Sequence, residues 1–226
     1  DDGSFGYKWT VDQKVLEEKT KTLILGNGVD SFDNMQGYLC DTEIESIILE
    51  GYHETLVLID GVLYEKIEDV RPYYDEDFLS EVSHLEDNPK LFSSKLTLRF
   101  IPPKMKIKKY VVPIDCVDFS PFSICNNNLE EIVFHNEFLY MDDMCFVECF
   151  KLKSIYLPKS LMCIGEYPLD ISGLEKITID TENKKYIVKN NSLLTFDGTE
   201  LIAIPPGLKD ELYEIINSMS GIYKNG

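Results

Sequence analysis

The chain has 226 residues, of which 44% are hydrophobic, so it is long enough to bury a sizeable core. Its 40 acidic residues outnumber 22 basic ones and give a formal net charge of −18, which disfavours nucleic acid and anionic membrane surfaces as partners. The aliphatic runs are a few residues long, far short of the roughly 20 apolar residues that a membrane-spanning helix needs.

A strand pattern with apolar residues at its first, fourth and sixth positions recurs along the chain. A weak copy ends in Leu23–Leu25, a clear copy is Ile44–Leu49, and later copies begin at Ile107, Leu129, Leu152 and Leu174. The later copies follow one another after about 22 residues, within the 20 to 29 residues of a leucine-rich repeat. We therefore expect five to seven stacked turns.

Alternation along each strand decides which side chains face the solvent. The fourth and sixth residues point to the same side and fill the core together with the leading apolar residue, so the alternate residues face the solvent on the inner, concave side of the stack. This frame predicts the following exposed positions: Ser46, Ile48, Lys109, Val111, Glu131, Val133, Ser154, Tyr156, Lys176 and Thr178.

A longer internal duplication is also present. Residues 44–67 align without a gap to residues 174–197, and Leu98–Pro103 aligns to Leu201–Pro206 after about 27 additional residues in the first copy. The dipeptides Asp60-Gly61 and Asp197-Gly198 are typical of hairpin turns, so each copy is interpreted as a repeat expanded by a β-hairpin.

The additional residues form an insertion at about 68–95. Phe78, Leu79, Val82 and Leu85 recur there at helical spacing, which predicts a short amphipathic helix. We expect this insertion to be an ornament that the repeats do not need for folding.

These residues resemble BspA-like leucine-rich repeats, and the resemblance covers most of the chain. Pro113 and Pro158 stand at the family's proline position and Ile164-Gly165 at its Ile-Gly, while Phe122 and Phe146 match its Phe, and Cys125 and Cys149 its Cys. The chain departs from the family pattern at Pro121, Cys145 and Pro168-Leu169.

The resemblance also extends to the N-terminal region. Trp9–Val11 followed by Thr22–Gly28 is similar to the hairpin that often precedes such repeats. We divide the chain into residues 1–43, a hairpin cap with a first repeat, and residues 44–226, the BspA-like repeats with their insertion.

The expected fold is a repeat solenoid. It is a right-handed leucine-rich-repeat stack with parallel strands on a concave face, short irregular or helical convex segments, and inserted hairpins.

The residue types that support catalysis or metal binding occur in this sequence without the matching motifs. The six cysteines include no CxxC pair, so Cys125 and Cys149 are predicted to be free, structural thiols. His53, His84 and His135 are scattered, and Asp142-Asp143 lacks the ligand spacing of a calcium loop. We predict no catalytic residue, no metal site and no cofactor.

The resemblance implies a secreted or cell-surface protein that adheres to other proteins, although no signal or lipid anchor is recognisable in these residues. We predict a non-enzymatic binding module that recognises a protein partner, such as a host or extracellular matrix protein, through its exposed strand positions. The predicted contact residues are Glu131, Val133, Ser154, Tyr156, Lys176 and Thr178. The alternatives are a carbohydrate-binding or hydrolytic protein on a solenoid scaffold, and a structural segment of a larger surface assembly.

Overall fold

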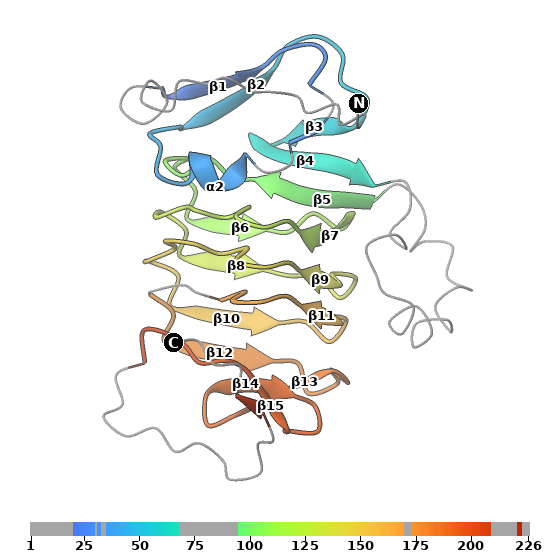
Figure 1. Ribbon diagram of the computed structural model, residues 1–226, viewed down its shortest axis with the longest axis vertical. Coiled ribbons are helices and arrows are strands. Elements are labelled where there is room, and N and C mark those ends of the chain that lie inside the picture. The colour runs from blue at the N-terminus through green and yellow to red at the C-terminus, as the bar shows by residue number, and fades with distance from the viewer. Residues whose placement is uncertain are drawn as a thin grey trace, which may run out of the picture.

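The computed structural model describes residues 20–29, 31–32, 35–67, 95–169, 173–208 and 221–222. These residues form a β-solenoid of about six turns, in which strands of successive turns lie on top of one another (Figure 1). The expected repeat solenoid with parallel strands is confirmed.

The predicted repeat strands form the first ladder of the stack. They are β1 (Thr22–Leu25), β2 (Ser46–Leu49), β6 (Lys109–Val111), β8 (Glu131–Val133), β10 (Ser154–Leu157) and β12 (Lys176–Ile179). Parallel pairs form between β1 and β2, β6 and β8, and β10 and β12, and β8 lies against β10. The pairing of Leu23 with Ile47 confirms the weak first copy of the repeat.

A second ladder runs along another side of the stack. It is a six-stranded sheet in the order β11-β9-β7-β5-β4-β3. Its strands are β3 (Leu56–Ile59), β4 (Val62–Ile67), β5 (Lys95–Phe100), β7 (Cys116–Phe119), β9 (Tyr140–Met141) and β11 (Cys163–Ile164). On a third side of the solenoid, successive turns are joined by isolated parallel β-bridges between Ile101 and Ile124 and between Ile124 and Phe146.

The two expected hairpin units are present as three-stranded meanders. The first meander is β3-β4-β5, and the second is β13 (Tyr186–Lys189), β14 (Ser192–Thr195) and β15 (Glu200–Ala203), whose last strand also pairs with β16 (Gly221–Ile222). Asp60-Gly61 turns the first hairpin with positive φ angles of 51° and 80°. The equivalent turn of the second meander is Asn190-Asn191, with φ angles of 47° and 59°, whereas Asp197-Gly198 connects β14 to β15.

The apolar core is divided into two main clusters. The stack core fills the interior of the turns and contains the leading leucines Leu129, Leu152 and Leu174, all fully buried. The cap core lies at the N-terminal end and consists of Leu25, Val29, Phe32, Leu39, Ile44, Ile47, Leu56, Leu63 and Phe100. Because Leu63 and Phe100 belong to β4 and β5, the first meander has apolar contacts with both clusters.

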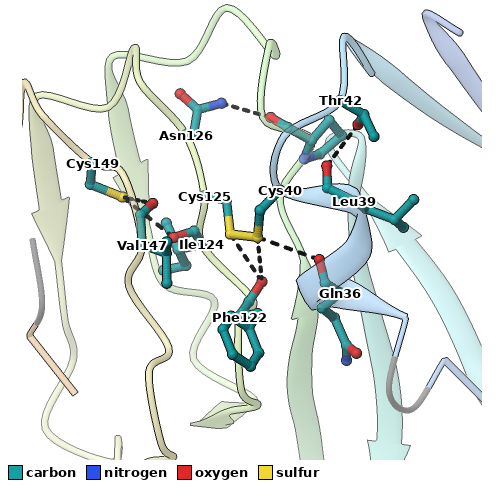
Figure 2. The surroundings of a disulfide bond; sticks show 11 residues. Gln36, Leu39, Cys40, Thr42, Phe122, Ile124, Cys125, Asn126, Val147 and Cys149 are labelled. Atoms are coloured by element: carbon teal, nitrogen blue, oxygen red, sulfur yellow. Dashed lines mark hydrogen bonds between the residues drawn. A yellow bond between two sulfur atoms is a disulfide. The ribbon is translucent and has the colours of Figure 1, made fainter. Parts of the chain in front are cut away.

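One disulfide joins the N-terminal end to the repeats, which corrects the prediction that Cys125 is a free thiol. Cys40 follows the short helix α2 (Gln36–Leu39) and bonds to Cys125, 85 residues later, with a Cα–Cα distance of 5.3 Å (Figure 2). That Cα separation lies in the usual range for a disulfide. Cys149 is free, as predicted, and its Sγ contacts the Ile124 carbonyl oxygen at 3.4 Å.

The structure also corrects one assignment within the repeat. Ile124, not Phe122, is the partner of Phe146 in the neighbouring turn. Phe122 instead takes a left-handed turn conformation with φ of 55°, as Met144 and Tyr167 do in the next two turns. The segment from Phe146 to Leu152 is one residue longer than the corresponding segment from Ile124 to Leu129. Glu148, with φ of 56°, lies within this longer segment.

Three predicted elements lie outside the described residues. They are the Trp9–Val11 half of the expected N-terminal hairpin, the insertion apart from Lys95, and the helix expected around Phe78 to Leu85. The described half of the hairpin, β1, is the first strand of the ladder. No helix within the described part of the chain is long and apolar enough to cross a membrane.

Candidate functional site

The candidate site is the outer surface of β6, β8, β10 and β12, which we call the strand face. The register places Lys109 beside Glu131 and Val111 beside Val133, and likewise Ser154 beside Lys176 and Tyr156 beside Thr178. The strands β6, β8, β10 and β12 follow one another along the stack (Figure 1), and β8 lies against β10, so we infer that these side chains form two parallel rows. The strand face therefore brings together all six residues predicted from the sequence.

One of these rows is apolar and exposed at two of its positions. Val111 is 58% exposed and Tyr156 is 54% exposed, while Val133 and Thr178 are partly buried. Neighbouring strands lie about 4.8 Å apart, so Val111, Val133, Tyr156 and Thr178 form one stripe. The remaining expected positions, Ser46 and Ile48, are exposed on β2 in the separate sheet that β1 and β2 form.

Two side chains of the stripe bond to groups outside their own strands, and one of them is Thr178, whose hydroxyl donates to Ile155 O at 3.0 Å. The Tyr156 hydroxyl donates a hydrogen bond of 3.0 Å to Oδ2 of Asp180, which follows β12. This hydrogen bond raises the pKa of Tyr156, and the amide of Glu182 together with the Tyr156 hydroxyl lowers the pKa of Asp180. The position of the Tyr156 ring is thus restricted by its bond to Asp180.

The second row and its neighbour are charged. Lys109 forms an ion pair with Glu131 at 2.7 Å. The residues just before them in the sequence, Lys108 and Glu130, form a second ion pair at 3.0 Å. Lys153 and Glu175 continue this pattern in the next two turns, at 3.7 Å. Ion pairs this exposed contribute little to stability, so their main effect is the pattern of charge that they present to a partner.

A charged hollow borders the strand face on this side. It has a volume of about 560 Å³ and is lined by Glu43, Glu45, Lys104, Lys106, Lys108, Asn128, Glu130 and Lys151. Four lysines and three glutamates almost neutralise one another there, in a chain whose net charge is −18. The surface beside the apolar stripe is therefore much less acidic than the protein as a whole.

Sequence reasoning missed several members of this face. Val111 was recognised as exposed but not selected, and Asp180 was not considered because it lies outside the strand pattern. The lysine and glutamate pairs could have been found, because Lys108 and Glu130 are separated by one repeat length, as are Lys153 and Glu175. Within the described residues, no group of three or more His, Cys, Asp or Glu side chains could hold a metal ion.

Comparison with protein families explains the repeat. The sequence model of the family described as "BspA type Leucine rich repeat region" matches residues 104–209 in six copies. Residues 104–209 are thus a BspA-type leucine-rich-repeat region. The matched repeats contain the whole strand face, from β6 to β12.

One solved structure supports the same fold. A leucine-rich repeat protein from Eubacterium ventriosum is 15% identical, with a TM-score of 0.51 over 73% of this chain and 37% of that one. The pneumococcal vaccine antigen PcpA is 19% identical, with a TM-score of 0.44 over 54% of this chain and 31% of that one.

A leucine rich cell surface protein from Faecalibacterium prausnitzii is 13% identical, with a TM-score of 0.31 over 61% of this chain and 42% of that one. The chain thus spans less than half the length of each of these proteins. The curated proteins that were compared with the chain gave no match.

Proposed function

We propose that this BspA-type solenoid is a non-enzymatic binding and adhesion module that recognises a protein partner on its strand face. The observation that carries the proposal is the exposed stripe through Val111, Val133 and Tyr156, which is bordered by rows of paired charges. An apolar centre with a polar rim is the usual anatomy of a protein interface. Repeat solenoids present such extended surfaces to their partners.

Tyr156 is the proposed anchor of the interface. Tyrosine is enriched among the residues that dominate binding, because it buries a large ring while its hydroxyl keeps a hydrogen-bond partner. The bond to Asp180 already fixes the ring of Tyr156, so little conformational freedom is lost when the partner binds. Glu131, Ser154, Lys176 and Thr178 surround the anchor and select the partner by polar complementarity.

The carboxylates of the strand face favour binding over catalysis. Glu131 is exposed to solvent and forms an ion pair with Lys109. A general base would instead be desolvated and free to accept a proton from a substrate. Glu130 is likewise paired with Lys108, so these two carboxylates do not form the unpaired acid and base that glycoside hydrolysis requires.

An extracellular or cell-surface location is part of the proposal. The Cys40–Cys125 disulfide supports this location, because structural disulfides form and persist in oxidising compartments. Alkylation and mass spectrometry of the protein from its native cells should find these two cysteines oxidised. Recovery of both as free thiols would count against an extracellular location.

Binding tests can separate the strand face from other surfaces. We expect Tyr156→Ala to weaken the affinity for a captured protein partner at least tenfold, with Val133→Asp acting similarly, while the melting temperature stays nearly constant. Tyr52→Ala is the matched control, because Tyr52 is 77% exposed and lies away from β6 to β12. Affinity should be measured by surface plasmon resonance with each variant immobilised.

The proposal fails if both strand-face variants bind the partner as tightly as the unmodified protein. Equal loss of binding in Tyr52→Ala would also contradict it, because that result would place recognition outside the strand face.

A further inference from the structure

A second candidate site lies at the C-terminal part of the stack, away from the strand face. It is a cavity of about 490 Å³ between the residues around β11 and the second meander. Its lining residues are Asp143, Ile164, Gly165, Glu166, Tyr167, Tyr186, Thr195, Glu200, Leu201 and Ile202. In Figure 1, β11 and β13 lie at the same edge of the stack, where these segments meet.

The floor of the cavity is apolar and aromatic. Ile164, Leu201 and Ile202 are partly buried, and so is Tyr186. Burial raises the pKa of Tyr186, and its hydroxyl donates to the Met162 carbonyl oxygen at 3.5 Å, so the phenol stays neutral. This floor can accommodate a hydrocarbon chain or the flat face of a planar group.

The mouth of the cavity is acidic and carries a second tyrosine. Asp143, Glu166 and Glu200 are exposed at the rim, and none of the described lining residues is basic. Oδ1 of Asp143 accepts a hydrogen bond of 2.6 Å from the Glu166 amide, which ties the two turns together. Tyr167 has a left-handed backbone with φ of 52°, lines the cavity and is 41% exposed.

We propose that this cavity binds the cationic side chain of a basic peptide segment, with arginine as the best fit. Three carboxylates attract a guanidinium group, and the faces of tyrosine rings attract cations held above them. The methylene stem of the arginine would pack on Ile164 and Ile202, as long cationic side chains do on apolar surfaces. The net charge of −18 would draw basic segments toward the protein.

The composition of the cavity argues against other ligand classes. A phosphate, sulfate or carboxylate group would be repelled by Asp143, Glu166 and Glu200. A neutral sugar would leave the same three charges without a counter-charge. The site requires no contribution from the strand face, so it stands independently of the proposed function.

The probe is a tetra-arginine peptide with blocked ends, compared with a tetra-citrulline peptide of the same shape but without charge. Isothermal titration calorimetry at low ionic strength should show binding of the arginine peptide and at least tenfold weaker binding of the citrulline peptide. Glu166→Gln combined with Glu200→Gln should weaken binding of the arginine peptide at least fivefold, and Tyr167→Ala at least threefold.

Glu50→Gln combined with Glu54→Gln is the matched control, since it changes the net charge equally but lies at the other end of the chain. This control and Tyr156→Ala should both leave peptide binding unchanged. Equal weakening by the two glutamate pairs would overturn the proposal, because attraction would then be a property of the whole acidic surface. Tighter binding of citrulline peptide or of maltotriose would overturn it too, by assigning a neutral ligand to the cavity.

Discussion

The two meanders have the same architecture but different surroundings. In the first, Leu63 pairs with Phe100 and Tyr64 with Leu98, and a bulge separates these pairs. In the second, Leu193 pairs with Ala203 and Leu194 with Leu201, with a bulge at the same place. The connection to the following turn is also shared, since Lys104 N donates to Ile44 O and Gly207 N to Leu174 O.

The two copies differ in what covers the second side of the sheet. Phe100 is fully buried in the cap core, where its ring centroid lies 5.8 Å from that of Phe32, whereas its counterpart Ala203 is only partly buried. Thr97 is buried and bonds to Asp118, whereas its counterpart Glu200 stands at the rim of the cavity. The same β unit therefore serves as an interior layer at one position and as the wall of an open site at the other.

The largest expected effect breaks the apolar contact that is specific to the first meander. Phe100→Ala should lower the free energy of unfolding by about 4 kcal/mol, because it removes a fully buried ring and leaves a cavity in the cap core. Phe196→Ala makes the same change in the second meander at a residue that is 51% exposed, and should have less than a quarter of that effect. Urea denaturation followed by circular dichroism measures both. Similar decreases in the free energy of unfolding for the two variants would contradict this explanation, which rests on the difference in burial.

The second prediction concerns the covalent link that holds the cap against the repeats. Cys40→Ala combined with Cys125→Ala should lower the free energy of unfolding by about 3 kcal/mol, because the disulfide no longer restricts the unfolded chain. Dithiothreitol should destabilise the unmodified protein to a similar degree and leave the double variant unaffected. An unfolding curve that does not respond to the reductant would refute the structural role of this bond.

The smallest expected effect concerns a carboxyl group beside the first meander. Burial, followed by the charge of Asp142, raises the pKa of Asp118 to about 7, although the Thr97 hydroxyl and Arg99 oppose this rise. The folded protein then holds this proton up to about pH 7, while the unfolded chain releases it near pH 4. The contribution of Asp118 to stability is therefore greatest below pH 4 and declines as the pH rises to 7.

Asp118→Asn should remove this dependence, so that the stability of the variant no longer declines in this way as the pH rises from 4 to 7. Melting temperatures of both proteins at half-unit intervals between pH 4 and pH 8 provide the measurement. Curves of identical shape would show that Asp118 does not titrate in this interval.

The sequence was sufficient to predict the strands and the duplication, because both depend on local spacing. Apolar residues at fixed positions, such as Leu129 and Ile132, must be buried for the turns to stack, and Asp60-Gly61 supplies the positive φ angles of a tight hairpin. The six contact residues predicted on the strand face follow from the same alternation, and their role in binding remains a prediction.

Features that depend on contacts between distant residues were not predictable in the same way. Cys40 and Cys125 meet because α2 lies beside a later turn, which no local pattern indicates. The additional residue near Glu148 changes the spacing between equivalent residues of neighbouring turns. For this reason the sequence pattern aligns Phe146 with Phe122, whereas the structure pairs Phe146 with Ile124. The cavity beside the second meander is lined by residues from separate turns, such as Asp143, Glu166 and Glu200, which no local sequence pattern brings together.

The turn at Asn190-Asn191 has a consequence for the edge of the strand ladder at β12. The side chain of Asn191 accepts a hydrogen bond from Ile177 N at 3.0 Å and donates one to Glu175 O at 2.8 Å. Its carboxamide thereby takes the place that the backbone of another strand would occupy beside β12. Exposed strand edges are templates for pairing with other chains and for aggregation, so this single side chain protects the edge of the ladder. At the equivalent position of the first meander stands Gly61, which has no side chain to act in this way. Asn191 thus satisfies two backbone groups at the end of the ladder, beside which β13 also lies.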